Sequence, residues 1–535
     1  MTRALLVSAA LGFLACVGLA AQAARQPAKP AFHTSDRCIA CHNGLTTAAG
    51  EDVSIGFEWR ASIMANSSRD PYWQASVRRE TLDHPEAAED VEDTCARCHM
   101  PMERYAAKVD GRKAKVFEHL PFKARRDGGS LAEDGVSCSL CHQIGTARLG
   151  TPESFTGGFE IDPPDAQGSH REYGPYDVDP GHTLIMKTST EGFVPAKADH
   201  IKSSEMCATC HTLITETLGP GGKPVGRLPE QVPFQEWLHS DYKATQSCQS
   251  CHMPLVKEPV AITRIFGAPR QLARHVFVGG NFFMQRMLNR YRDALDPAAL
   301  VGELDTAAAR TEQHLATQAA RITIGDPALV QGRVEFDVSI ENLGGHKLPT
   351  AYPSRRVWLH VTVRDSAGRV VFESGRVNGD ASIVGNDNDA DKTRYEPHYA
   401  VIRRPDEVQI YESVLGDTTG AVTTGLLAAS QYLKDNRLLP HGFDKRTAEA
   451  DIAVHGAAAE DADFIGGADC VRYSVEGGTA SGPFSVEAEL LYQPIGFRWA
   501  QNLKGYPQAA EPKRFTGYYD AMAAGATARL ARASR

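Results

Sequence analysis

The chain has 535 residues, 23% of them charged and 42% hydrophobic, and its formal net charge at pH 7 is −9. This acidic balance disfavours nucleic acids and acidic lipid surfaces as partners, because both carry negative charge themselves. The length indicates two or more domains.

The first 23 residues are predicted to be a signal peptide. Arg3 precedes an apolar run from Ala4 to Ala20, and Ala21-Gln22-Ala23 forms an A-x-A cleavage site. No later apolar run approaches the ~18 residues that a membrane-spanning helix needs, so no transmembrane segment is expected. We therefore expect a soluble mature chain that is periplasmic or otherwise extracytoplasmic.

One motif, C-x-x-C-H, occurs five times between residues 38 and 252. The copies are Cys38, Cys41 and His42; Cys95, Cys98 and His99; Cys138, Cys141 and His142; Cys207, Cys210 and His211; and Cys248, Cys251 and His252. C-x-x-C-H is the attachment sequence of c-type haem, in which both thiols form thioethers and the imidazole is the proximal iron ligand. The sequence thus predicts five covalently bound haem c groups.

Other uses of C-x-x-C explain this pattern less well. Thioredoxin-like sites come singly, and zinc knuckles or disulfide frameworks do not require a histidine after the second cysteine. Outside the motifs, Cys16 lies in the signal peptide and Cys470 is predicted to be a buried thiol. Residues 24–280 are therefore predicted to form a pentahaem cytochrome c domain of short helices and irregular segments.

The rest of the chain changes from helical to strand periodicity. Residues 281–325 are predicted to be a helical connector, because Phe283, Met287 and Tyr291 recur at helical spacing. Residues 326–535 are predicted to be β-rich, with alternation such as Val334 to Ile340, and to end in a helical tail from Tyr519 to Arg532. The predicted fold class is α+β: a mostly irregular or helical multihaem domain, then helices, then an antiparallel β-sandwich-like domain.

The motifs and the phrases around them resemble the multihaem c-type cytochrome superfamily, in the branch that includes hydroxylamine oxidoreductase and its tetrahaem cytochrome c electron acceptor. The phrases are Asp134-Gly135-Val136, Ser204-Glu205-Met206, Met253-Pro254, His275 to Asn281, and Gly345 to Thr350. The resemblance covers most of the mature chain. It implies respiratory-type electron transport between redox protein partners and only weakly implies a particular reaction.

The second axial ligand of each iron separates an electron carrier from an enzyme, because only an iron with an open site can bind a substrate. Five residues are candidate distal ligands: His275, His200, His182, His346 and Met64. His275 ranks first because it stands in the family-like phrase. His346, on a predicted β-domain loop, could also join the two domains, and the alternative for Met64 is an ordinary core methionine.

We expect a periplasmic pentahaem electron carrier. The alternative is a multihaem oxidoreductase that acts on a small nitrogen or sulfur compound at one five-coordinate haem. For such an enzyme the sequence indicates no catalytic residues and contains no C-x-x-C-K variant.

The acidic series Asp387, Asp389 and Asp391 raises the question of a calcium site. An EF-hand would require Gly at position 392 and Glu at 398, where Lys392 and His398 stand. An irregular calcium site remains the alternative to a solvated acidic loop.

Overall fold

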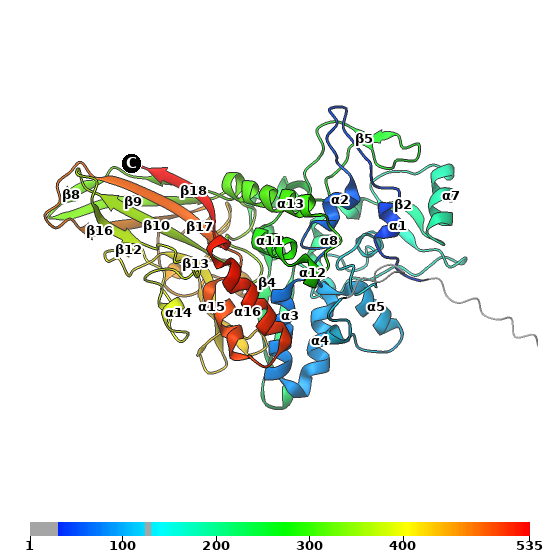
Figure 1. Ribbon diagram of the computed structural model, residues 1–535, viewed down its shortest axis with the longest axis horizontal. Coiled ribbons are helices and arrows are strands. Elements are labelled where there is room, and N and C mark those ends of the chain that lie inside the picture. The colour runs from blue at the N-terminus through cyan, green and yellow to red at the C-terminus, as the bar shows by residue number, and fades with distance from the viewer. Residues whose placement is uncertain (1–29, 123–129) are drawn as a thin grey trace, which may run out of the picture.

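The computed structural model describes residues 30–122 and 130–535 (Figure 1). The predicted signal peptide, with Cys16, lies outside the described residues. Helices dominate the N-terminal part, on the right of Figure 1, and long strands dominate the C-terminal part, on the left. The α+β class is therefore confirmed. No helix among the described residues is both long and apolar enough to cross a bilayer.

The N-terminal part consists of short helices joined by irregular segments. The helices are α1 (Asp36–Ile39), α2 (Ile55–Arg60), α3 (Pro71–Asp83), α4 (Ala88–His99), α5 (Pro101–Val109), α6 (Cys138–Cys141), α7 (Pro180–Ser189), α8 (Ser204–Ala208), α9 (Pro233–Leu238) and α10 (Cys248–His252). Its strands form two-stranded ribbons: β1 (Arg171–Gly174) with β2 (Val194–Lys197), β3 (Leu213–Leu218) with β4 (Pro224–Gln231), and β5 (Val260–Ala261) with β6 (Pro269–Arg270).

Three helices follow: α11 (Phe282–Arg290), α12 (Arg292–Leu295) and α13 (Val301–His314). α11 buries the apolar face predicted from its periodicity, including Phe283 and Met287. A π-helical turn continues α13 to Ala319, and β7 (Ala320–Ile324) then begins within the segment expected to be a helical connector. Ile322 is buried in a sheet opposite Ile340 of the next long strand, so sheet pairing overrides the helical spacing there.

Two larger sheets form the C-terminal part. One has the order β14-β13-β10-β17-β18, with β11 beside β10 and β15 beside β13; the other has the order β12-β16-β9-β7, with β8 beside β9. The strands are β8 (Ala328–Val330), β9 (Arg333–Asn342), β10 (Arg356–Arg364), β11 (Val370–Ser374), β12 (Val401–Ile402), β13 (Ile410–Asp417), β14 (Val422–Thr423), β15 (Ala429–Asp435), β16 (Ala468–Glu476), β17 (Ser485–Gln493) and β18 (Ala528–Ser534).

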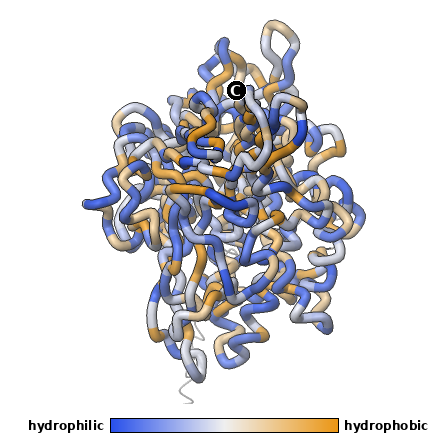
Figure 2. The backbone as a smooth tube through the Cα atoms, turned by 90° about the vertical axis from the view of Figure 1, so that its left-hand side faces the viewer, coloured by the Kyte–Doolittle hydropathy of each residue, from blue (hydrophilic) through white to orange (hydrophobic). Residues whose placement is uncertain are grey.

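The apolar faces of the two sheets contribute to one hydrophobic core. Tyr473 of β16 stacks on Phe336 of the same sheet, with ring centres 5.0 Å apart, and meets Phe372 of the other sheet edge-on at 6.0 Å. Buried residues alternate with more exposed ones along β9, as the period of two predicts. Figure 2 shows hydrophobic and hydrophilic stretches interleaved along the backbone of the whole molecule.

The C-terminal end differs from the predicted helical tail. The helix α16 (Ala510–Met522) ends before the expected Arg532, and β18 follows and pairs with β17. Leu530 is buried in this sheet, and the backbone of β18 pairs with that of β17, a contact with a remote strand that no local helix signal reflects. α16 packs against α3, where Glu511 pairs with Arg78 at 2.9 Å and Phe515 meets Tyr72.

Candidate haem-binding site

A single large cavity connects the five motifs. It has a volume of about 1670 Å³, and all ten motif cysteines and all five motif histidines line it. Cavities that hold one drug-sized ligand occupy about 300–1,000 Å³, so this one has room for several ligands. The tertiary structure therefore gathers the predicted attachment residues around one shared interior.

Local helical geometry orients each motif. In an α-helix, residues i, i+3 and i+4 lie on one face, which brings both cysteines and the histidine of C-x-x-C-H to the same side. The expected helical closure is present at Cys38–His42, Cys138–His142 and Cys207–His211, where each histidine N–H donates to the cysteine carbonyl at 3.0 Å. The prediction of short helices at the motifs is confirmed.

Thiols of different motifs lie next to one another. The Cys38 thiol lies near that of Cys138, the Cys98 thiol near that of Cys210, and the Cys207 thiol near that of Cys248; in each pair the neighbouring thiol, together with burial, raises the pKa of the first cysteine. The cysteines of the described residues are nevertheless all free thiols. The first motif is thus adjacent to the third, and the fourth is adjacent to both the second and the fifth.

Four of the five motif histidines are held through Nδ1. The Nδ1 atoms of His42, His99, His142 and His252 lie 2.5–2.9 Å from backbone carbonyl oxygens of Ile262, Ser67, Tyr173 and Val278, respectively. A carbonyl partner fixes the proton on Nδ1 and leaves Nε2 free as a metal ligand, which is the usual arrangement of ligating histidines. Burial lowers the pKa of His99 and of His252 to about 4, so both imidazoles are neutral at pH 7.

Two motif histidines lie near a second imidazole at the ring separation expected for two ligands of one iron. The ring centres of His142 and His275 are 6.4 Å apart with 15° between the planes, and those of His252 and His346 are 6.2 Å apart with 16°. With about 2 Å from iron to each Nε2 and about 1.1 Å from Nε2 to the ring centre, two imidazoles on one iron have centres about 6.2 Å apart.

The two facing residues also have the hydrogen bonds of metal ligands. His275 Nδ1 lies 2.9 Å from the Ala273 carbonyl oxygen, and His346 Nδ1 lies 3.0 Å from that of Lys347. His275 and His346 can therefore serve as distal ligands at the third and fifth motifs.

For the other three candidates, Met64, His182 and His200, no contact with a motif histidine is found among the residues that the structure describes. Met64 lines the cavity and packs beside Val136 and Leu140. His182 also lines it, but both ring nitrogens are engaged, with Asp179 at 2.5 Å and the Ile265 carbonyl at 2.9 Å. His200 is not among the lining residues and places Nε2 2.8 Å from the Ile144 carbonyl oxygen.

Trp73 is a site residue that the sequence analysis missed. Asp70 caps α3 by accepting from the backbone N–H groups of Tyr72 and Trp73, with Pro71 at the first helical position. This cap places the Trp73 indole flat against His99, with ring centres 4.4 Å apart and planes within 6°. Helix-start signals in the sequence indicate α3 itself, but no spacing rule links Trp73 to a motif on another helix.

The cavity wall fits a large apolar ligand. Phe266 is 92% exposed and Leu255 is 61% exposed, and both line the cavity. Large apolar side chains in such positions are favourable when a porphyrin face covers them. Together with the thiol and imidazole donors, they make the residues of the cavity a suitable set for covalent haem.

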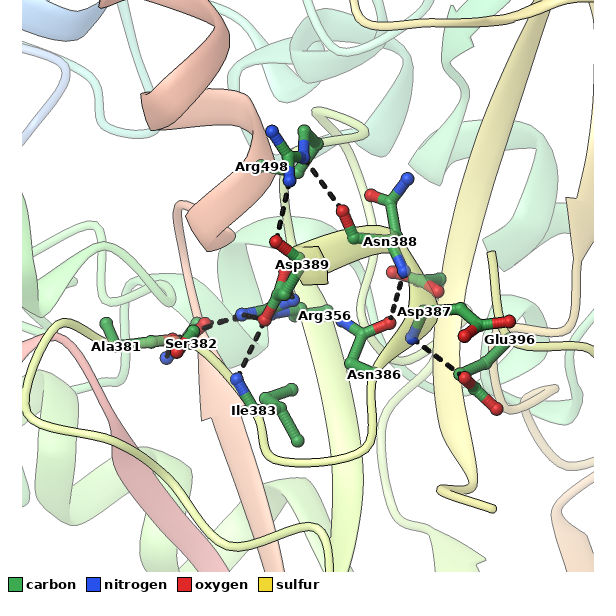
Figure 3. A network of polar contacts seen from close by, with 12 residues as sticks. Arg356, Ala381, Ser382, Ile383, Asn386, Asp387, Asn388, Asp389, Glu396 and Arg498 are labelled. Atoms are coloured by element: carbon green, nitrogen blue, oxygen red, sulfur yellow. Dashed lines mark hydrogen bonds and ion pairs between the residues drawn. The ribbon is translucent and has the colours of Figure 1, made fainter. Parts of the chain in front are cut away.

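The acidic series does not form a calcium site (Figure 3). Asp389, on α14 (Asp387–Ala390), binds both Nη atoms of Arg356 at 2.8 and 3.0 Å and accepts the Ile383 N–H. Asp387 pairs with Arg394, and Asp391 accepts the hydroxyl and the N–H of Thr393. The three carboxylates thus have separate partners and do not converge on one ion.

Replacing Asp389 by asparagine is expected to lower the free energy of unfolding by about 3–5 kcal/mol, because it leaves the buried Arg356 guanidinium without its counter-charge. Chemical denaturation would measure the loss. Asp391→Asn, at an exposed position of the same loop, should cost about 1 kcal/mol or less. Added calcium should leave the midpoint of thermal unfolding of the parent protein unchanged; a clear calcium-dependent rise would contradict this assignment.

A second cluster, His398, Asp461 and Asp469, also has the residue types of a metal site. His398 Nδ1 faces the amide nitrogens of Gln409 and Asn436, at 2.9 and 3.1 Å. Backbone contacts fix both amides, since Gln409 Oε1 accepts from Tyr399 N–H and Asn436 Nδ2 donates to the Ile410 carbonyl. His398 therefore carries its proton on Nε2 and donates it to Asp461 at 3.1 Å, which closes a hydrogen-bond network.

The fold has a counterpart among solved structures. A penta-heme cytochrome c552 from Thermochromatium tepidum superposes with a TM-score of 0.50 over 95% of this chain and 99% of that chain, at 15% sequence identity. At this identity the similarity shows a shared fold. No family model matches the sequence. No curated protein matches it either.

Proposed function

We propose that this chain is an extracytoplasmic pentahaem cytochrome c that carries electrons between redox proteins. The observation that carries the proposal is the cavity that all five C-x-x-C-H motifs line. Two of the motif histidines have a second imidazole nearby, at the ring-centre separation expected for two ligands of one iron. A fold shared with a penta-heme cytochrome supports it. The signal peptide predicted for residues 1–23 supports the extracytoplasmic location.

In this proposal, haem iron supplies reversible one-electron chemistry, and the chain supplies position and environment. The ten thiols anchor the groups covalently, and the carbonyl partners of Nδ1 fix the orientation of the motif imidazoles. Adjacent thiols such as Cys98 and Cys210 bring neighbouring attachment sites close together. The third and fourth motifs are also neighbours, because Cys210 lies near Cys141. These short separations favour electron transfer from the first motif to the third, the fourth and the fifth, with the second motif beside the fourth.

The proposal is tested by producing the full chain in a host that matures c-type cytochromes. The expected product has the mass of the processed polypeptide plus five haem groups and a strong Soret band that denaturation and acid extraction do not remove. The same chain from a host without the maturation system serves as the control. A mass equal to bare polypeptide from the competent host would refute the proposal.

The second candidate function is an oxidoreductase acting on a small nitrogen or sulfur compound, as in the branch that the sequence resembles. It is favoured by acidic and phenolic groups near the second motif. Burial raises the pKa of Glu230 to about 7, Thr215 donates to this carboxyl group at 2.6 Å, and Glu230 lies near Cys95 and Tyr352. A group with this pKa can hold or release a proton at neutral pH.

Turnover assays with nitrite, hydroxylamine and tetrathionate would distinguish the two candidates. Activity that is lost in Glu230→Gln, at unchanged haem content, would support the enzyme. Absence of turnover with all three compounds would favour the carrier.

A further inference from the structure

The loop that carries His346 is held from both parts of the molecule. It runs from Leu343 to Thr350 between β9 and β10. On the C-terminal side, Asn342 Nδ2 donates to the His346 carbonyl at 2.8 Å, and Leu348 exchanges two backbone hydrogen bonds with Leu438, at 2.8 and 2.9 Å. These contacts fix the loop to the sheets, but they do not determine its distance from the motifs.

Glu236, on α9, supplies the contact from the N-terminal side. Its side chain is fully buried. Oε2 accepts the N–H of Lys347 at 3.1 Å and the hydroxyl of Thr350 at 2.5 Å. One carboxylate thus holds the loop at the residue next to His346 and again three residues further on.

The other oxygen of Glu236 belongs to a buried charge cluster. Glu236 Oε1 lies 2.9 Å from Arg437, which forms two hydrogen bonds of 2.8 Å with Asp435, and Asp435 accepts from Lys347 Nζ at 2.8 Å. These four residues are between 0% and 5% exposed. Two cations and two anions balance, so removing the Glu236 charge leaves a buried cation uncompensated.

The loop from Leu343 to Thr350 lies directly against the N-terminal part that carries the five motifs. Tyr242, in the short 3-10 helix at Asp241–Ala244, donates to the Leu343 carbonyl at 2.9 Å. A Cβ at Gly345 would lie 3.3 Å from Tyr242 and 3.4 Å from Trp237, so a larger residue there would push the loop outward. The contacts of Tyr242 and Glu236 with the loop thus lie on either side of His346 in the sequence. The ring centre of His346 is 6.2 Å from that of His252.

From these contacts we infer that Glu236 is the positioning residue that keeps His346 on the iron of the fifth motif, so that docking of the two parts and ligation of this haem depend on each other. The inference rests on the proposed function, because it requires haem at Cys248 and Cys251. Glu236 acts through the loop and does not touch the iron itself. Loss of its contacts lets the loop withdraw and opens one axial site.

Glu236→Ala in the matured full chain tests this inference. Electron paramagnetic resonance of the ferric protein should show one of the five haems changed from low spin to high spin, with an upward shift of one midpoint potential. His346→Ala should give the same spectrum. Glu236→Gln keeps an oxygen that can accept from Lys347 and Thr350 but removes the charge that faces Arg437. It should therefore lower the free energy of unfolding and still retain a larger low-spin fraction than Glu236→Ala.

Two further variants make the result decisive. Asp451→Asn removes an exposed ion pair with Arg227 that also joins the two parts, and should leave all spin states unchanged. If Glu236→Ala does not fold, Thr350→Val removes one loop contact and should raise the high-spin fraction by a smaller amount. The same number of low-spin haems in Glu236→Ala as in the parent protein, or equal loss in Asp451→Asn, would overturn the inference. Haem-free protein would instead refute the proposed function.

Discussion

In the proposed pentahaem cytochrome, replacing His275 by alanine is expected to convert one haem iron from low spin to high spin. His275 is the imidazole that faces His142, and no other described ring occupies that position at the third motif. Without it, the iron loses one of two strong nitrogen ligands, so its spin state changes and it becomes able to bind carbon monoxide or cyanide. Paramagnetic resonance and optical titration with carbon monoxide would measure both effects.

The matched control is His200→Ala. His200 was also a candidate ligand in the sequence, ranked below His275, but it is not among the residues that line the cavity. Its removal should leave the spin states and carbon monoxide binding unchanged. A high-spin signal in His200→Ala together with an unchanged spectrum in His275→Ala would show that the ligand assignment is wrong.

Removing both thiols of the third motif, by Cys138→Ser with Cys141→Ser, is expected to have the largest effect on stability. The third motif adjoins the first, because Cys138 lies near Cys38. It also adjoins the fourth, because Cys210 lies close enough to Cys141 to raise the pKa of its thiol. Loss of covalent attachment there exposes apolar lining in the middle of the cavity. The free energy of unfolding should fall by more than the ~5 kcal/mol that marks the largest effects of single core deletions.

Mass spectrometry should show one haem fewer in this double variant, and chemical denaturation should show the lower stability. Cys470→Ser is the control, because Cys470 lies outside the motifs, on β16, where its thiol accepts from the Ser339 hydroxyl of β9 at 3.6 Å. This thiol is half-buried, and not fully buried as the sequence predicted. The control variant should keep five haems and near-parental stability. Unchanged haem content in Cys138→Ser/Cys141→Ser would contradict the assignment of the third motif.

Sequence periodicity predicted helices and strands correctly where one face of the element is buried and the opposite face is exposed. The alternation from Val334 to Ile340 became β9, and the spacing of Phe283 and Met287 became α11. It failed at Ile322 and Leu530, which were assigned to helical segments but lie in strands. In both cases, pairing with a neighbouring strand outweighs a weak local preference, and such pairing depends on residues remote in sequence.

In the candidate site, too, local features were predictable from the sequence and contacts between remote segments were not. The sequence by itself predicted the attachment residues, because C-x-x-C-H acts through spacing within one helical turn, which is a local property. Only the tertiary structure decided which imidazoles face His142 and His252, because eligible histidines occur throughout the chain and ligation depends on distance in space. It also decided the contacts of Glu236: a buried carboxylate between two parts of the fold has no signature in sequence, since its partners come from segments that meet only when the chain folds.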